Sequence, residues 1–562
     1  MVEMVGRECK FVTHLAKIAG VRPDIHVIKE TLHYSDGSLK DNLKIVKNYK
    51  RPFYVTKEHY RTHKQKKESE DLEKVNVHYS TESDLGRNIA TRLGSRYNGV
   101  YKLRDVIDSP YIYGVDTRST AIIKKAYMDK YPKAISPYTL ATLDIENNTI
   151  TNEITIVSLV MKDKIHCIAT KKYLDESDAN TRDAKSRVLD LYEKYIPETD
   201  IKKEAKITFE IVENEYELVK DIFKVAHKWG PDFVAIWNID YDIPMMVKVI
   251  EKYGGDPKDI FSDPDLPKEY RYFKYKEGMK QKITESGKFK PVNPEEQWHT
   301  TIAPAKFFLI DAMAAHRYVR VGGKSTPGGY SLNNILVQEL GDRLKKLTFG
   351  GEEEEKFKGI EWHQYMTANK PLEYIVYNMW DCMSMIELDK KTKDLSTVLP
   401  MLSATSHFSI FNSGPKKIVD GMHFYYLEQN KVLGVKPSVV KADSILGLDD
   451  WIILLPSHRI KNLGLQMVEE DPNLRMNTRG HTYDSDCVSS YPSDTMCANV
   501  SKDTIARQLI NIKGIEKEEF KKQNINLFFG EVNAVEYCRT MYNFMDMDTL
   551  QNYANEYLKE TA

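Results

Sequence analysis

One short apolar run constrains the fold of this chain more than any other stretch: residues 141–146, Ala-Thr-Leu-Asp-Ile-Glu. Alternate side chains of a β-strand point to opposite faces, so Asp144 and Glu146 share one face while Leu143 and Ile145 enter a core. Two carboxylates side by side on a buried strand repel each other and lose solvation. Because a divalent cation is the usual compensation, the run predicts half of a metal site.

Composition limits the class of protein. The 562 residues are enough for about three or four domains. The net charge is −1, from 81 basic and 82 acidic residues, so any contact with nucleic acid must come from local patches. The six cysteines form no Cys-x-x-Cys pair, which indicates a reduced intracellular protein without structural zinc. No apolar run approaches the ~20 residues of a membrane span.

From residue 138 onwards the pattern indicates an α/β domain. Strands come first and then alternate with helices. The expected strands are 141–145, 153–161, 165–170, 207–212, 232–237 and 307–310. The expected helices are 215–229, 331–340 with Ser331 as its cap, 372–393 and 414–429. Residues 268–290 are rich in Lys and Tyr and are expected to form a hairpin or a loop insertion.

The first 135 residues mix basic helix-like segments with strands expected at 25–27 and 53–55. Residues 47–67 interleave basic and aromatic side chains. Such a stretch can hold a single strand of nucleic acid by charge and stacking. The interpretation that we favour is a solvated basic face, balanced by the acids of residues 68–73.

Two further segments offer acids to the same site. Asp242 follows the expected strand 232–237, at the rim of an α/β sheet where ligands bind. Tyr377 and Asp381 are four residues apart in the expected helix 372–393, so they share a face.

These three segments, Asp144-Ile145-Glu146, Asn238 to Asp242 and Tyr377 to Asp381, resemble the three exonuclease motifs of family B DNA polymerases. The proofreading domain of that family has an RNase H-like fold. The resemblance implies that four acids hold two magnesium or manganese ions: Asp144, Glu146, Asp242 and Asp381. Oxygen ligands suit these ions, and an ion pair can activate a water and stabilise the leaving 3′ oxygen.

The same resemblance assigns roles to three more residues. Tyr377, with Glu146, would help to position the attacking water. Asn238 and Tyr241 would position the frayed 3′ end of the DNA.

Residues 486–493, Asp-Cys-Val-Ser-Ser-Tyr-Pro-Ser, resemble motif A of the polymerase palm. The resemblance implies that Asp486 is a metal ligand and that Tyr491 lies under the sugar and rejects a 2′ hydroxyl. Cys487, Ser489 and Ser490 would face the metal and the nucleotide triphosphate. Residues 483–486 could instead imitate the Asp-Thr-Asp core of motif C, or the stretch could be an Asp-rich loop. The Ser-Ser-Tyr-Pro-Ser continuation favours motif A.

The fingers helix and the Asp-Thr-Asp motif of the family do not appear between Asp503 and Ala562. One palm aspartate cannot hold the two ions of nucleotidyl transfer. The chain is therefore expected to polymerise only with a partner that supplies these parts, as the N-terminal subunit of a split, phage-like polymerase. A truncated gene is the rival account.

The sequence thus predicts a multi-domain α/β protein. Its expected parts are an N-terminal domain (1–135), an exonuclease domain (136–395), a linker that returns to the N-terminal domain (396–475) and a partial palm (476–562). The expected partners are primer-template and single-stranded DNA, the second polymerase subunit and a sliding clamp, with no membrane. The expected location is intracellular, in the cytoplasm of an infected bacterium if a phage encodes the chain. Two alternatives stay open: a stand-alone 3′–5′ exonuclease with a vestigial palm, and a non-catalytic DNA-binding scaffold.

Overall fold

The computed structural model describes residues 3–64, 66–94, 103–176, 183–283, 289–320, 326–350, 356–410 and 414–436, and the pairs 528–529 and 532–533. The chain divides into two units, residues 1–438 and 439–562. In the second unit, β19 (Phe528–Phe529) pairs with β20 (Val532–Asn533) in antiparallel sense. The predicted motif A, residues 486–493, lies outside the described residues.

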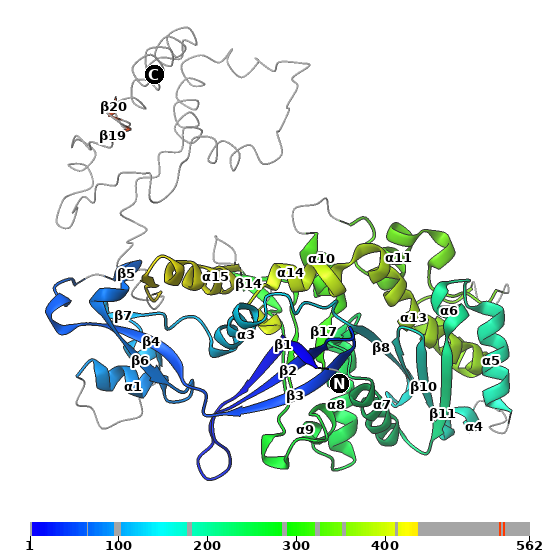
Figure 1. The fold of residues 1–562 in the computed structure, drawn as a ribbon. Helices are drawn as coiled ribbons and strands as arrows, with labels where there is room; N and C mark the ends of the chain where they lie inside the picture. Colours follow the sequence, from blue (N-terminus) through cyan, green and yellow to red (C-terminus); the bar gives the residue numbers. More distant parts are fainter. Residues whose placement is uncertain are drawn as a thin grey trace, which may run out of the picture. The chain divides into compact units, whose positions relative to one another are not determined.

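The largest described sheet of the first unit has six strands in mixed orientation, in the order β11-β10-β9-β8-β12-β17. Figure 1 labels β8, β10, β11 and β17 of this sheet. Strand β9 runs antiparallel to both β8 and β10, whereas β12 runs parallel to β8 and to β17, and β11 runs parallel to β10. The predicted strands of this region are confirmed to within three residues at each end. Their bounds are β8 Leu140–Asn147, β9 Ile154–Met161, β10 Lys164–Thr170, β11 Lys206–Val212, β12 Phe233–Ile236 and β17 Phe308–Asp311.

Helices cover both faces of this sheet. The side chains of Ala141, Leu143 and Ile145 on β8 are buried in a core with α7 (Glu215–Trp229) and α8 (Ile239–Lys252). The opposite face of the sheet packs against α5 (Ala184–Tyr195) and α13 (Pro371–Thr392) in a second core. Strand alternation therefore turns Asp144 and Glu146 towards α13, as the sequence predicts.

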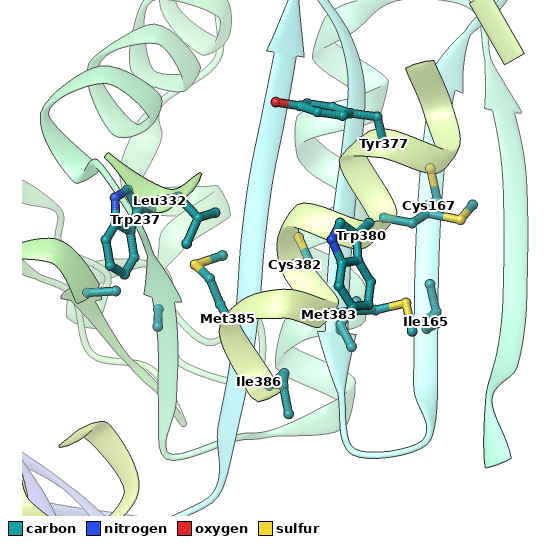
Figure 2. Packing of buried hydrophobic residues seen from close by; sticks show 14 of the residues in the cluster. Ile165, Cys167, Trp237, Leu332, Tyr377, Trp380, Cys382, Met383, Met385 and Ile386 are labelled. Atoms are coloured by element: carbon teal, nitrogen blue, oxygen red, sulfur yellow. The ribbon is translucent and has the colours of Figure 1, made fainter. Parts of the chain in front are cut away.

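Helix α13 is buried along most of its length and lies across the strands (Figure 2). Trp380 and Cys382 have no exposed surface, and the Thr142 hydroxyl of β8 donates a 2.8 Å hydrogen bond to the Cys382 carbonyl. The Cys382 thiol in turn contacts the Ser158 carbonyl of β9 at 3.3 Å. These contacts hold α13 in a fixed register over β8 and β9.

Capping side chains set the bounds of several helices. Asn214 accepts hydrogen bonds from the amides of Tyr216 and Glu217 at the start of α7, and the helix ends at Gly230 with φ of +61°. A positive φ favours glycine at this position. Helix α11 (Leu332–Leu340) begins after Ser331, whose hydroxyl accepts from the Asn334 amide, so the predicted cap is confirmed.

Two smaller sheets precede the central one. One is an antiparallel meander of β1 (Met4–Leu15), β2 (Ile25–Tyr34) and β3 (Leu39–Lys47). The other joins β4 (Arg51–Thr56) to β6 (Val75–Ser80) and β7 (Ile112–Tyr113). The strands predicted at 25–27 and 53–55 lie within β2 and β4.

The basic and aromatic stretch 47–67 contributes to a core. Phe53 is completely buried, and so is Arg51, whose guanidinium donates to the Gly114 carbonyl at 2.6 Å. Lys66 donates to the Val435 carbonyl at 2.9 Å, and Lys67 pairs with Glu70 at 2.6 Å. These side chains are engaged within the protein, which leaves fewer of them for nucleic acid.

The region 396–436 contacts the N-terminal part of the chain again. Strand β18 (Lys431–Leu433), which follows α15 (Gly414–Glu428), pairs with β5 (Ser69–Asp71). In the predicted insertion 268–290, β13 (Lys274–Lys276) pairs with β16 (Thr300–Ile302), and β14 (Gln281–Ile283) forms a hairpin with β15 (Phe289–Pro291).

The remaining described α-helices have 4 to 12 residues. They are α1 Leu85–Arg92, α2 Leu103–Val106, α3 Ser119–Lys130, α4 Lys171–Glu176, α6 Asp200–Glu204, α9 Pro257–Phe261, α10 Ala312–Val319, α12 Ile360–Asn369 and α14 Leu399–Ser403. Among all helices that the structure describes, none combines the length and the apolar character that a membrane crossing requires. Cys9, Cys167 and Cys382 are buried free thiols.

Candidate active site

Three carboxylates from two elements meet between the central sheet and α13. Asp144 and Glu146 come from β8, and Asp381 comes from α13. One oxygen of each lies within 4.8 Å of the others. Asp144 is half-buried, while Glu146 and Asp381 are 7% and 2% exposed.

The fourth predicted acid, Asp242, lies in the first turn of α8, which follows β12. Because β12 is the parallel neighbour of β8, this turn lies beside the end of β8 that carries the two acids. Among the described residues, the three acids whose oxygens lie within 4.8 Å of one another are Asp144, Glu146 and Asp381, and Asp242 is not one of them. Burial, together with the charges of Asp144 and Glu146, raises the pKa of Asp242 well above its usual range.

One face of α13 supplies the polar partners of these acids. Asn378 donates a 2.8 Å hydrogen bond to Asp144 Oδ2, and the Tyr374 hydroxyl donates to Glu146 Oε2. His363 Nδ1 lies 2.6 Å from the Tyr374 hydroxyl, which extends this chain to α12. The spacing of Tyr374, Asn378 and Asp381 places them along one side of the helix.

Lys346 brings a positive charge to the site. Its Nζ lies 2.5 Å from Asp381 Oδ2 and 2.9 Å from the Tyr377 hydroxyl. It also lies 5.0 Å from the centre of the Tyr377 ring. The charges of Asp381 and Asp144, with the hydrogen bond to Asp381, outweigh burial and raise the pKa of Lys346 well above its usual range, so its ammonium stays charged.

The acids of the site hold protons more tightly than exposed carboxylates do. Burial, reinforced by the charge of Asp381, raises the pKa of Asp144 to about 7. Burial also raises the pKa of Asp381 despite the hydrogen bond from Lys346. For Glu146, burial and the charge of Asp144 raise the pKa well above its usual range. One lysine therefore does not neutralise this concentration of acids.

A fifth carboxylate, Asp311, lies at the end of β17, opposite Ile236 of β12. Its Oδ1 accepts from the Ala314 amide at 2.9 Å and caps α10. Its Oδ2 is buried without a hydrogen-bond partner, and burial raises the pKa of the Asp311 carboxyl to about 8. This charge is one of those that raise the pKa of Asp242.

The two residues predicted to touch a DNA end are on the surface. Asn238, at the N-cap of α8, is exposed, and Tyr241 in the first turn of this helix is 46% exposed. The Tyr241 hydroxyl donates to Asn147 Oδ1 at 2.7 Å, which ties this surface to the end of β8.

The donor set fits a hard divalent cation. Its atoms are carboxylate oxygens, which suit magnesium and manganese better than softer metals. Asp381 Oδ1 is buried without a hydrogen-bond partner, although Oδ2 of the same carboxylate is paired with Lys346. A cation would satisfy this oxygen and compensate the mutual repulsion of the acids.

The structure therefore brings together Asp144, Glu146 and Asp381, with Asp242 and Tyr377 beside them and Asn238 and Tyr241 at the rim. The other predicted site residues lie outside the described residues: Asp486, Cys487, Ser489, Ser490 and Tyr491.

Sequence reasoning missed Lys346, Tyr374, Asn378 and His363. Helical spacing was an available signal for Tyr374 and Asn378, since they lie seven and three residues before Asp381. Lys346 and His363 come from separate segments, and no local pattern distinguishes them.

Neither a model of a known protein family nor a curated protein sequence matches this chain.

Proposed function

We propose that this chain is a metal-dependent 3′–5′ DNA exonuclease, built as the proofreading part of a polymerase similar to family B. The observation that carries the proposal is the convergence of Asp144, Glu146 and Asp381 within 4.8 Å. Asp381 follows Asp144 and Glu146 by more than two hundred residues in the sequence, and the three acids occur in the order that the resemblance requires. Asp242, Asn238 and Tyr241 line the adjoining edge.

The topology of the central sheet supports an RNase H-like fold. Its first strand, β8, has the hairpin strands β9 and β10 on one side and the parallel strands β12 and β17 on the other. Strand β8 carries Asp144 and Glu146, two of the acids of the proposed site.

Asp144, Glu146, Asp242 and Asp381 would hold two magnesium or manganese ions. When bound, such ions supply charge neutralisation at the phosphate and activation of water. The protein's own side chains do the positioning: Asn378 orients Asp144, and Tyr374 orients Glu146. Lys346 holds Asp381 and the Tyr377 hydroxyl in place. Exposed Asn238 and Tyr241 are available to the last bases of a frayed strand.

The decisive experiment follows digestion of 5′-labelled single-stranded DNA by the full-length chain with Mg²⁺. We expect products that shorten from the 3′ end and no digestion in EDTA. The double variant Asp144→Asn/Glu146→Gln should lose at least ~1,000-fold in rate, because two ions lose ligands together. The matched control Asp190→Asn changes an exposed acid of α5 and should digest normally. Undiminished digestion by the double variant would refute the site.

We further propose that polymerisation requires a second chain with the fingers and the Asp-Thr-Asp motif. The purified chain should then extend no primer by itself. Nucleotide incorporation by the chain alone would contradict this split arrangement. Full nuclease activity without any co-purifying partner would favour a stand-alone exonuclease. Binding of DNA with no metal binding would favour a scaffold.

A further inference from the structure

A second cluster of metal-binding side chains lies in the β1–β2–β3 sheet. His14 of β1 and His26 of β2 are cross-strand partners, so their side chains leave the same face of the sheet. Their ring centroids are 4.7 Å apart. Asp24 immediately precedes β2 and lies between the two rings and the segment around Ser83.

The distances within this cluster suit one metal ion. His14 Nε2 lies 3.2 Å from both oxygens of Asp24, and His26 Nδ1 lies 3.8 Å from Asp24 Oδ1. One atom of each of the three residues lies within 4.8 Å of the others. In a tetrahedral zinc site with bonds of ~2.0–2.1 Å, ligand atoms are about 3.3 Å apart. The distances of 3.2 and 3.8 Å from the two imidazole nitrogens to Asp24 are close to this separation.

A buried nitrogen without a partner points independently to a ligand. The side chain of His26 has no exposed surface, and its Nδ1 makes no hydrogen bond. The other nitrogen of the ring, Nε2, lies 2.8 Å from the Ser119 hydroxyl. When Nε2–H donates to that hydroxyl, Nδ1 carries a lone pair, which is the form that binds metals. The distance of 3.8 Å from Nδ1 to the carboxylate is too long for a hydrogen bond, so a cation between them would satisfy both atoms.

The carboxylate is held in place from its other side. Asp24 Oδ2 accepts hydrogen bonds from the amide and the hydroxyl of Ser83, at 3.0 and 2.5 Å. Support of this kind orients a metal ligand and is characteristic of built sites. The side chain of His14 is 21% exposed, which leaves an entry path for an ion and room for a water as the fourth ligand.

We propose that His14, Asp24 and His26 bind one divalent transition-metal ion such as zinc. This site is separate from the acids of the candidate active site. Two imidazoles select a borderline transition metal, whereas magnesium and calcium prefer oxygen ligands. The ion ties β1 and β2 to the Ser83 segment, and through Ser119 to the start of α3. The site uses no cysteine, so the absence of paired cysteines in the sequence does not bear on it.

The test uses the full-length chain after removal of metals, in excess Mg²⁺ so that the oxygen-rich site is saturated. Zinc is titrated in competition with a chromophoric chelator. We expect one tightly bound zinc ion per chain and a rise in the melting temperature. The variants His14→Ala and Asp24→Asn should each bind zinc at least ~10-fold more weakly, whereas His59→Ala, which changes an exposed histidine, should bind as the parent does.

Cobalt gives a second readout that does not depend on stability. Co²⁺ bound to the parent should show the strong visible absorption of a four-coordinate site, and His14→Ala should lose it. His14 is only half-buried, so this variant should fold even if changes at buried Asp24 or His26 do not. Failure of the parent to bind zinc in excess Mg²⁺, or equal zinc binding by His14→Ala and His59→Ala, would overturn the proposal.

Discussion

Lys346 Nζ lies 2.5 Å from Asp381 Oδ2, at the centre of a group of acids whose pKa values are raised by burial. The side chain of Asp381 is 2% exposed and that of Lys346 is 28% exposed, so the pair is largely shielded from water. Removing one partner of a buried ion pair costs more than the pair itself contributes, because the remaining charge is left uncompensated.

The variant Lys346→Met should therefore destabilise the metal-free protein. We expect a loss of about 3 kcal/mol in EDTA, seen as a lower melting temperature, because Asp381 loses its cation. Added Mg²⁺ should restore part of this loss by supplying positive charge. Lys345→Met is the matched control, since Lys345 is exposed and adjacent. Equal melting temperatures of the two variants in EDTA would show that the ion pair does not stabilise the site.

The hydroxyls of Tyr374 and Tyr377 have different partners, and this predicts different consequences of their loss. Tyr374→Phe removes the donor to Glu146, whose pKa this hydrogen bond lowers. The affinity for Mn²⁺, measured by the loss of its free-ion electron paramagnetic resonance signal, should fall about 10-fold. Tyr377→Phe removes a hydroxyl that accepts from Lys346, not a donor to Glu146, and should weaken Mn²⁺ binding less. If Tyr377→Phe weakened Mn²⁺ binding more than Tyr374→Phe did, Tyr377 would be the residue that supports Glu146.

Trp380 links the core to the position of Lys346. Its indole Nε1 donates a 2.8 Å hydrogen bond to the Lys345 carbonyl, and its side chain is completely buried. Trp380→Phe should destabilise the chain by about 1–3 kcal/mol, because that carbonyl loses its donor and a smaller ring leaves a space.

The same variant should slow DNA digestion at a temperature where it is still folded, since Lys346 is no longer held. Trp229→Phe on α7, which faces the other core, controls for the loss of an indole. If the two variants digest DNA at the same rate, Trp380 does not influence the site.

Much of the central sheet could be predicted from the sequence because its signals are local. The alternation in residues 141–146 determines which side chains of β8 meet α13, and the cap at Ser331 marks the start of α11. The three acids within 4.8 Å were predicted together because each lies in a recognisable pattern on its own element.

What the sequence could not reveal depends on contacts between distant segments. Arg51 lies in a stretch that looks like a basic surface, yet it is completely buried because the carbonyls of Gly114 and Val115 accept its hydrogen bonds. Lys346 reaches Asp381 only because α13 packs beside the segment that follows α11. His14 and His26 face each other only through the register of β1 and β2. None of these contacts leaves a repeating pattern of residues in the sequence.

A buried acid on α15 predicts a pH dependence of stability. Asp420 of α15 is 2% exposed, and burial raises its pKa from 3.8 to about 6, against the opposing effects of the Ser406 hydroxyl at 2.9 Å and the charges of Arg118 and Arg51. Between these two pKa values the folded state binds more protons than the unfolded state. The contribution of Asp420 to stability therefore falls as the pH rises from about 4 to about 6.

Asp420→Asn should remove this loss, since its amide carries no charge and can still accept from Ser406. We expect the variant to be more stable than the parent above pH ~6, by up to about 2 kcal/mol, and no more stable below pH ~4. Thermal melts at a series of pH values measure the difference, and Asp190→Asn, on the surface of α5, should show none. A gain that is the same at all pH values would assign the effect to packing, because only the ionisation of Asp420 gives it a pH dependence.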